Sequence, residues 1–240
     1  MIDLKNVTKK FGSFTAVDDL TLTVAPGEFF GFLGPNGAGK TTTIKMICGL
    51  FTPTSGEITI NGFSTTSQPM EAKQTIAYIP DQPFLYDKLT GREFLYFVGG
   101  LYKIPKQLMR ERVEESIEHF EIGSWVDKRT EDYSQGMRQR ITIASALLHK
   151  PNTIIIDEPM IGLDPRSAKI VRETLHQQAS SGVSIFMSTH NLPVAEELCD
   201  RIGIINNGKL VFADTREHLQ TFKQQYDGTL DSLFLALTNR

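Results

Sequence analysis

The chain has 240 residues, 40% of them hydrophobic, and its 25 basic and 28 acidic side chains give a formal net charge of −3. This length suits one large domain with a packed core. The near balance of charge gives no general attraction to nucleic acid, so no nucleic-acid partner is expected. Its two cysteines, Cys48 and Cys199, are typical of a reducing compartment.

No apolar run approaches the roughly 18 residues that a membrane-spanning helix needs. The first residues also lack the apolar core of a secretory signal. If the protein works at a membrane, we expect a separate chain to hold it there.

Strand-like and helix-like patterns alternate along the chain. The predicted strands lie, in chain order, at 2–7, 20–24, 29–33, 58–60, 76–79, 153–156, 183–188 and 202–205. Helical patterns lie at 40–50, through most of 90–149 and between the later strands, and Asn61-Gly62 predicts a hairpin turn. This alternation predicts an α/β fold with a mainly parallel sheet and helices on both faces.

A Gly-rich loop follows the apolar strand at 29–33. Residues 34–41 read Gly-Pro-Asn-Gly-Ala-Gly-Lys-Thr, which matches the phosphate-binding loop pattern, and a helix follows. Such glycines let successive backbone N–H groups face the phosphates, and the helix adds its positive N-terminal end. Lys40 is predicted to reach the β- and γ-phosphates of ATP, and the Thr41 hydroxyl to bind Mg²⁺. The predicted nucleotide-binding residues of this loop are Asn36, Gly37, Ala38, Gly39, Lys40, Thr41 and Thr42.

Two acids end the apolar strand at 153–156. In a parallel sheet this strand end lies beside the phosphate loop. Asp157 is therefore predicted to hold Mg²⁺, usually through water, and Glu158 to orient or deprotonate the attacking water. Alone, an Asp-Glu pair would be weak evidence, because solvated acids are common at strand ends.

Three further segments resemble those of ATP-binding cassette (ABC) proteins. Residues 133–140, Tyr-Ser-Gln-Gly-Met-Arg-Gln-Arg, resemble the family's signature sequence. Residues 162–165, Gly-Leu-Asp-Pro, resemble the dimer-contacting loop, and residues 188–190, Ser-Thr-His, the switch histidine. The order of these segments after the phosphate loop identifies the chain as similar to ABC ATPases from about Phe11 to His190.

The resemblance implies a P-loop NTPase fold, with a RecA-like core, an antiparallel β subdomain and an inserted helical subdomain. The expected division is 1–83 and 151–215 for the core with the β subdomain, 84–150 for the helical subdomain and 216–240 for a C-terminal helical segment. It also implies a head-to-tail dimer that encloses two ATP molecules. This chain contains every motif that such a site needs, so two copies of it could form both sites. This favours a homodimer.

The resemblance further assigns residues outside the phosphate loop. Ser134 and Gly136 are expected to face the γ-phosphate bound by the opposite subunit, and His190 the γ-phosphate in its own site. Ser134 is also a plausible helix N-cap, and the two roles are compatible. Phe11 falls where the family places an aromatic that stacks on adenine, and Phe14 lies close by; the alternative is an exposed aromatic at the edge of the core.

Two interpretations stay open from the sequence. The family has a Gln after the strand at 76–79 that contacts Mg²⁺, but in the simplest register this position holds Asp81, with Gln82 next to it. Asp164 is either a helix N-cap before Pro165 or a residue of the dimer contact.

The expected function is an ATP-hydrolysing subunit that energises transport by a separate transmembrane permease. The signature variant, residues 83–93 and the closing segment 229–235 resemble ATPase subunits of ABC-2-type exporters. We therefore expect a peripheral protein on the cytoplasmic side of the membrane. The aromatic and apolar residues Phe84, Leu85 and Tyr86 are candidates to receive a permease helix; the alternative for these residues is that they close the core between the two lobes. The alternative is a soluble ABC ATPase without a transport role, for example in cluster assembly.

Overall fold

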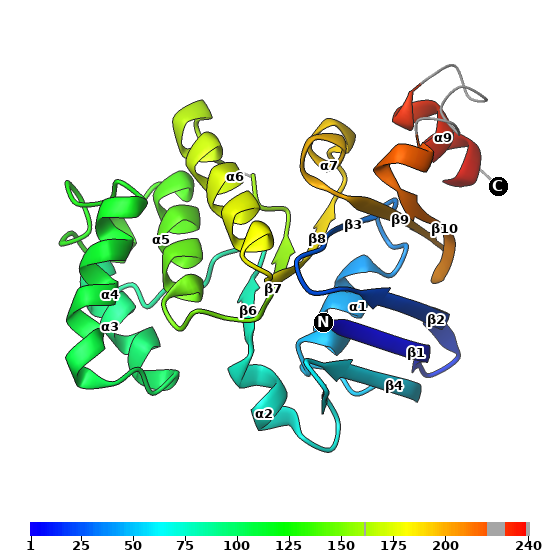
Figure 1. Ribbon diagram of the computed structural model, residues 1–240, viewed down its shortest axis with the longest axis horizontal. Coiled ribbons are helices and arrows are strands. Elements are labelled where there is room, and N and C mark those ends of the chain that lie inside the picture. The colour runs from blue at the N-terminus through cyan, green and yellow to red at the C-terminus, as the bar shows by residue number, and fades with distance from the viewer. Residues whose placement is uncertain (161, 220–228, 239–240) are drawn as a thin grey trace.

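The computed structural model describes residues 1–160, 162–219 and 229–238, and it contains two sheets (Figure 1). The larger sheet has the strand order β10-β9-β3-β8-β7-β6. These strands are β10 (Lys209–Thr215), β9 (Arg201–Asn206), β3 (Phe29–Leu33), β8 (Ser184–Thr189), β7 (Thr153–Asp157) and β6 (Ile76–Ile79). Its neighbours pair in parallel except β9 with β10, which confirms the mainly parallel sheet predicted from the sequence.

The smaller sheet is antiparallel and is built from the N-terminal quarter of the chain. Its order is β2 (Phe14–Val24), β1 (Ile2–Phe11), β4 (Ser55–Ile60) and β5 (Phe63–Ser64). Asn61 and Gly62 both have positive φ, 50° and 86°, as a two-residue hairpin turn requires. The predicted hairpin is therefore confirmed, and Ile60 pairs with Phe63 across it.

Helix α1 (Lys40–Ile47) lies between the two sheets and shares one hydrophobic core with them. Successive residues of β3 point to opposite faces: Phe30 and Phe32 join this core, while Phe29 and Leu33 join the core on the far face. Burial on both faces explains why the sequence of β3 is continuously apolar rather than alternating.

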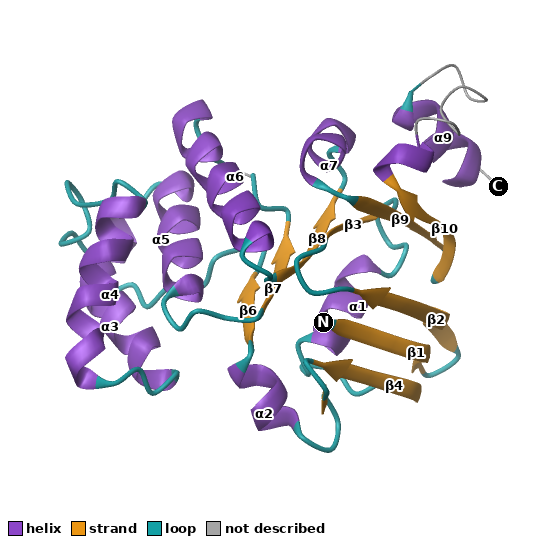
Figure 2. Ribbon diagram, in the orientation of Figure 1, coloured by secondary structure: helices purple, strands orange, loops and turns teal. Residues whose placement is uncertain are grey.

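The second core is covered by helices, which Figure 2 shows in purple on the side of the sheet away from β1 and β2. These helices are α3 (Gly91–Leu101), α4 (Lys106–His119), α5 (Gln135–Leu147), α6 (Pro165–Ser180), α7 (Leu192–Leu198) and α9 (Leu230–Thr238). Helices α3, α4 and α5 stand together beyond β6, within the stretch assigned above to a helical subdomain (Figure 1). None of the helices in the described ranges is long and apolar enough to cross a membrane.

Some element boundaries differ from the sequence predictions. The helix expected at 40–50 ends at Ile47, because Gly49 adopts a left-handed φ of 62° and the N–H groups of Leu50 and Phe51 return to the carbonyl of Lys45. Strand β1 ends later than predicted, at Phe11, and β2 begins earlier, at Phe14, because antiparallel pairing continues to the tight turn that joins them. Of the C-terminal segment predicted at 216–240, residues 220–228 and 239–240 lie outside the described residues.

Candidate active site

The phosphate loop connects β3 to α1, and close packing requires glycine at two of its positions, Gly34 and Gly39. Gly39 has a φ of 112°, and a Cβ there would lie 2.6 Å from the carbonyl oxygen of Ala16. A Cβ on Gly34 would lie 2.4 Å from the carbonyl oxygen of Ile205. Because Gly39 is the N-cap of α1 and has no side chain, the first-turn N–H groups of the helix face the loop without a side-chain cap.

Lys40 is the first residue of α1, and its ammonium group lies inside the loop. Its Nζ donates to the carbonyl oxygens of Gly34 at 2.6 Å and Pro35 at 3.1 Å. Burial lowers the pKa of Lys40, and the nearby carboxylates of Glu158 and Asp157 act in the opposite direction. The cation is thus set among acceptor oxygens that ATP phosphates can replace.

Asp157 ends β7 and is 6% exposed. Its carboxylate accepts a hydrogen bond from the Ser188 hydroxyl on the neighbouring strand β8, where the two residues are paired in register. Burial raises the pKa of Asp157, with further contributions from Asp81 and Glu158 and an opposing one from Ser188. A buried carboxylate with this raised pKa gains from a nearby cation, so its surroundings are suited to a nucleotide-bound Mg²⁺.

Glu158 is held by three hydrogen bonds to its carboxylate. The donors are the Thr189 hydroxyl at 3.0 Å, the His190 backbone N–H at 2.8 Å and the His190 ring Nδ1 at 2.5 Å. Because an ionised carboxylate only accepts hydrogen bonds, Nδ1 carries the ring hydrogen in this contact. Glu158 itself has a left-handed φ of 50°, a costly conformation for a residue other than glycine.

A cavity of about 460 Å³ gathers these groups. Its lining residues are Phe14, Ala16, Asn36, Gly37, Gly39, Lys40, Thr41, Thr42, Asp81, Asp157, Glu158 and His190. The structure therefore brings together nine of the predicted site residues of the loop and the strand ends, and Asp81 with them. A volume of this size is typical of a small-molecule site.

Five predicted residues lie outside this lining. Ala38 is buried, and Gln82 is exposed beside Asp81, whose carboxylate accepts from the Gln82 N–H at 2.8 Å. Phe11 packs edge-on against Phe51, with ring centroids 5.6 Å apart, and Phe14 lines the cavity instead.

Ser134 and Gly136, the other two, open α5 away from this cavity. The Ser134 hydroxyl caps the helix by accepting from the Met137 N–H. A Cβ on Gly136 would lie 2.7 Å from the carbonyl oxygen of Gly162, so the signature segment touches the loop that follows Glu158 in the same chain. Asp164 caps α6 by accepting from the N–H groups of Arg166 and Ser167, which confirms its N-cap role.

Ser188 and Thr189 hold the two acids, a role that sequence reasoning did not assign. The signal was present, because a Ser-Thr pair ending one strand lies beside an Asp-Glu pair ending its neighbour. The contacts form because the strand register pairs Asp157 with Ser188, and this register is not evident from the sequence.

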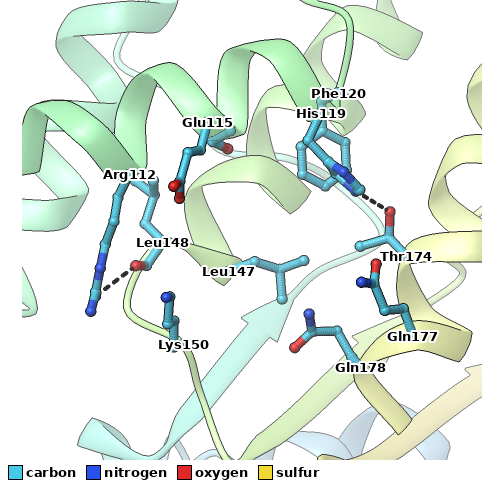
Figure 3. Close-up of a pocket in the computed structure, with 11 residues that line it drawn as sticks. Arg112, Glu115, His119, Phe120, Leu147, Leu148, Lys150, Thr174, Gln177 and Gln178 are labelled. Atoms are coloured by element: carbon cyan, nitrogen blue, oxygen red, sulfur yellow. Dashed lines mark hydrogen bonds between the residues drawn. The ribbon is translucent and has the colours of Figure 1, made fainter. Parts of the chain in front are cut away.

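A second cavity, of about 340 Å³, lies between α4, α5 and α6 (Figure 3). At one end Arg112 donates to the carbonyl oxygen of Leu148 at 3.1 Å, and at the other His119 contacts the Thr174 hydroxyl at 2.7 Å. It has neither the Gly-rich loop nor the acid pair of the first cavity, which is therefore the candidate active site.

Comparisons with known proteins agree with this geometry. The sequence profile of the ABC transporter family matches residues 17–161. The linearmycin resistance ATP-binding protein LnrL of Bacillus subtilis (strain 168) is 38% identical over 219 residues, which cover 91% of this chain and 70% of LnrL. Across other curated relatives the chain spans between 41% and 97% of the relative's length.

Solved structures show the same fold. An ATP binding subunit of an ABC transporter superposes with a TM-score of 0.91 at 33% identity, covering 99% of both chains. The dimeric ATP-binding cassette MJ0796 bound to ADP and Pi has a TM-score of 0.81 at 27% identity and covers 90% of this chain and 99% of its own. The chain belongs to the ABC transporter family and is an ATP-binding subunit with ATPase chemistry.

Proposed function

We propose that this chain hydrolyses Mg·ATP at the Lys40–Glu158 cavity and so energises export through a separate transmembrane permease. This proposal rests on the three hydrogen bonds that fix the Glu158 carboxylate, at a cavity that Lys40 and Asp157 also line. A carboxylate fixed in this way needs no reorganisation to accept a proton from a water molecule beside the γ-phosphate.

The proposed Mg²⁺ site uses few protein ligands. No group of three or more His, Cys, Asp or Glu side chains suited to a metal occurs among the described residues. Mg²⁺ bound to a nucleotide usually takes one or two protein oxygens, phosphate oxygens and water, which the Thr41 hydroxyl and Asp157 suit. A bound Mg²⁺ would neutralise charge on the phosphates. Asp81, which lines the same cavity, is a better candidate than Gln82 for a water-mediated contact with it.

The protein's own groups supply the rest of the proposed reaction. Lys40 and the first-turn N–H groups of α1 hold the β- and γ-phosphates, and Phe14 or Phe11 supports the adenine ring. Glu158 accepts the proton as the water oxygen attacks the γ-phosphorus, and the bond from that phosphorus to the bridging oxygen of ADP breaks. His190 fixes the Glu158 carboxylate through Nδ1, and we propose that it also contacts the γ-phosphate.

The proposed working unit is a homodimer with two such sites. MJ0796 forms a dimeric cassette, and 27% identity over 90% of this chain supports the same assembly here. Ser134 and Gly136 lie away from their own chain's cavity, as is needed if they complete the partner's site. The N-terminus of α5 would then point its N–H groups at the partner's γ-phosphate.

The permease is proposed to dock on an aromatic surface of the helical region. Phe84 is 77% exposed and Tyr86 48%, and their rings meet edge-on at 5.7 Å. Tyr86 also meets the exposed Phe97 of α3 at 5.1 Å. We name these three residues the aromatic surface. LnrL is a resistance protein by name, which supports export as the direction of transport. The proposed place of action is the cytoplasmic side of the membrane, as the resemblance to exporter subunits implies.

Substitution of Glu158 by Gln tests the proposal. Gln keeps the size and one acceptor oxygen, so ATP binding should persist, while loss of the base should lower steady-state phosphate release by about a hundredfold or more. The matched control is Glu173→Gln, the same change on an exposed residue of α6. Hydrolysis by Glu158→Gln close to that of the control would remove Glu158 from the proposed role.

A further inference from the structure

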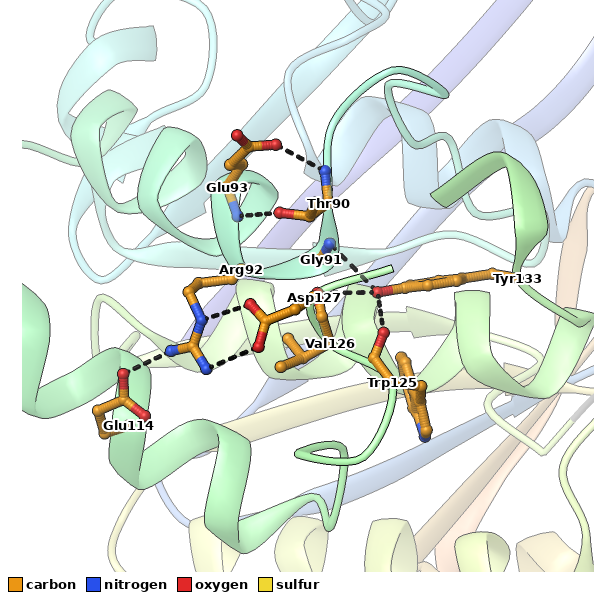
Figure 4. Close-up of polar contacts among 9 residues, drawn as sticks. All are labelled: Thr90, Gly91, Arg92, Glu93, Glu114, Trp125, Val126, Asp127 and Tyr133. Carbon is orange, nitrogen blue, oxygen red and sulfur yellow. Dashed lines mark hydrogen bonds and ion pairs between the residues drawn. The ribbon is translucent and has the colours of Figure 1, made fainter. Parts of the chain in front are cut away.

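Tyr133 immediately precedes the signature Ser134 and is buried, with only 6% of its surface exposed. Its hydroxyl accepts a hydrogen bond from the N–H of Gly91 at 3.1 Å and faces the carbonyl oxygens of Trp125 and Val126, each at 3.2 Å (Figure 4). A phenolic hydroxyl has one hydrogen to donate and accepts as well, so both of its capacities are used here. Tyr133 thus connects three separate stretches of backbone.

The Gly91 contact completes the N-terminus of α3. A helix begins with four N–H groups that lack partners inside the helix. Here Thr90 N–H reaches the Glu93 carboxylate, Gly91 N–H the Tyr133 hydroxyl, Arg92 N–H the Val126 carbonyl and Glu93 N–H the Thr90 hydroxyl. A Cβ on Gly91 would lie 2.3 Å from the Tyr133 oxygen, so residue 91 must be glycine while Tyr133 is present.

The same stretch before Ser134 is bound to the loop of residues 84–90, which carries Phe84 and Tyr86 of the aromatic surface and which we name the permease-docking loop. The Thr130 N–H donates to the Leu89 carbonyl and the Thr130 hydroxyl to the Tyr86 carbonyl, both at 2.9 Å. Lys88 and Glu131 form an ion pair at 2.7 Å. Residues 86–91 and 126–133 are therefore joined along their length by contacts of backbone as well as of side chains.

The Arg92 side chain adds a charged connection. It contacts both carboxylate oxygens of Asp127, at 2.7 and 3.3 Å, and Nη1 also reaches Glu114 of α4 (Figure 4). A bidentate Arg–carboxylate pair fixes direction as well as distance. It connects the first turn of α3 to the segment that ends in Tyr133.

We infer that Tyr133 is a positioning residue that fixes the signature Ser134 relative to the permease-docking loop. The inference rests on the proposed function, because it needs Ser134 to act on the partner's ATP and a permease to contact the aromatic surface. Tyr133 and Ser134 are adjacent in the chain, so a displacement of the Tyr133 ring moves the start of α5. A shift of Tyr86 imposed by a permease thereby reaches the γ-phosphate of the opposite site.

Tyr133→Phe in the hydrolysis-deficient Glu158→Gln background tests this inference. Loss of the hydroxyl leaves the Gly91 N–H without its acceptor and loosens the start of α5. We expect ATP-dependent dimerisation, measured by sedimentation over a series of protein concentrations, to weaken by about tenfold. Affinity of the monomer for a fluorescent ATP analogue should be unchanged, because the chain's own phosphate loop is not involved.

Tyr102→Phe in the same background is the matched control. Tyr102 is also partly buried and also donates from its hydroxyl to a backbone carbonyl, that of Ile76 at 3.3 Å, at the far end of α3. A merely structural role predicts equal effects of the two substitutions on dimerisation. Equal dimerisation of the two variants would overturn the inference.

The Gly91→Ala substitution provides a rescue experiment. The added methyl group clashes with the Tyr133 oxygen, so Gly91→Ala alone should weaken dimerisation, and addition of Tyr133→Phe should restore part of it. Additive losses in the double variant would contradict the proposed contact. If Glu158→Gln alone binds ATP and forms no dimer, the proposed dimeric function fails, and this inference fails with it. If the dimer forms equally well with and without Tyr133→Phe, only the inference is overturned.

Discussion

Lys40 illustrates how the site depends on a single residue. Its ammonium group donates to two neutral carbonyl oxygens. When ATP binds, charged phosphate oxygens are expected to replace these carbonyl oxygens as hydrogen-bond acceptors. Charge-assisted hydrogen bonds contribute about 1.5–3 kcal/mol each, which predicts that Lys40→Ala weakens ATP binding by roughly ten- to a hundredfold. Equilibrium dialysis with labelled ATP measures this loss directly.

Lys45 gives the matched control for that measurement. It stands on the same helix, and its ammonium group lies 5.4 Å from the centre of the Phe51 ring instead of facing the loop. Lys45→Ala should keep the ATP affinity of the unmodified protein. Equal affinities in the two variants would separate Lys40 from phosphate binding.

The residues of the candidate site were predictable where a motif fixes both residue type and spacing. Lys40, Asp157 and Glu158 follow from the phosphate loop and from the acids that end an apolar strand. Which of Phe11 and Phe14 lines the cavity could not be predicted in this way, because it depends on how the chain turns between β1 and β2. Register between strands, which paired Ser188 with Asp157, is likewise a property of tertiary packing.

At the scale of single elements, α3 depends on its capping box. Thr90 accepts from the Glu93 N–H at 3.1 Å, and the Glu93 carboxylate accepts from the Thr90 N–H at 2.8 Å. Thr90→Ala removes one of the two bonds and should lower the free energy of unfolding by about 1 kcal/mol in urea titrations. Thr90→Ser retains the hydroxyl and should be close to the unmodified protein, and indistinguishable Ala and Ser variants would contradict the cap.

The elements with a continuous apolar sequence matched their predictions better than those with a mixed one. Strands β3, β7 and β9 are apolar on both faces, so their sequences identify them without tertiary information. Strand β10 has an alternation of half-buried and exposed residues and pairs at the sheet edge, and the sequence analysis did not predict it. Helix α2 (Pro69–Gln74) has one buried residue, so it too lacks a clear periodic signal.

At the scale of the whole molecule, stability should depend on pH through His149. This residue follows α5, and its ring stacks on Tyr102, the C-cap residue of α3, with centroids 3.6 Å apart. Burial lowers the pKa of His149 from 6.5 to about 4. Between these values the unfolded chain binds a proton that the folded chain does not, so stability falls as the pH is lowered from 6.5 towards 4.

Urea unfolding at a series of pH values from 7 to 4.5 tests this dependence. His149→Phe keeps an aromatic ring against Tyr102 and removes the titrating group, so its stability should fall less steeply over this range. The exposed His218, replaced in the same way, serves as the control. Parallel curves for the His149→Phe variant and the unmodified protein would exclude His149 as the source of the slope.

The contact of Gly136 with Gly162 has a consequence for two catalytic sites that work as a pair. In the proposed dimer, Gly136 belongs to the segment that contacts the ATP of the partner's site. Gly162 follows Glu158, which belongs to the chain's own site. The two glycines are in close contact within one chain. A rearrangement at one site is therefore expected to act on a backbone segment of the other site. In such an assembly we expect the two ATP molecules to be hydrolysed cooperatively.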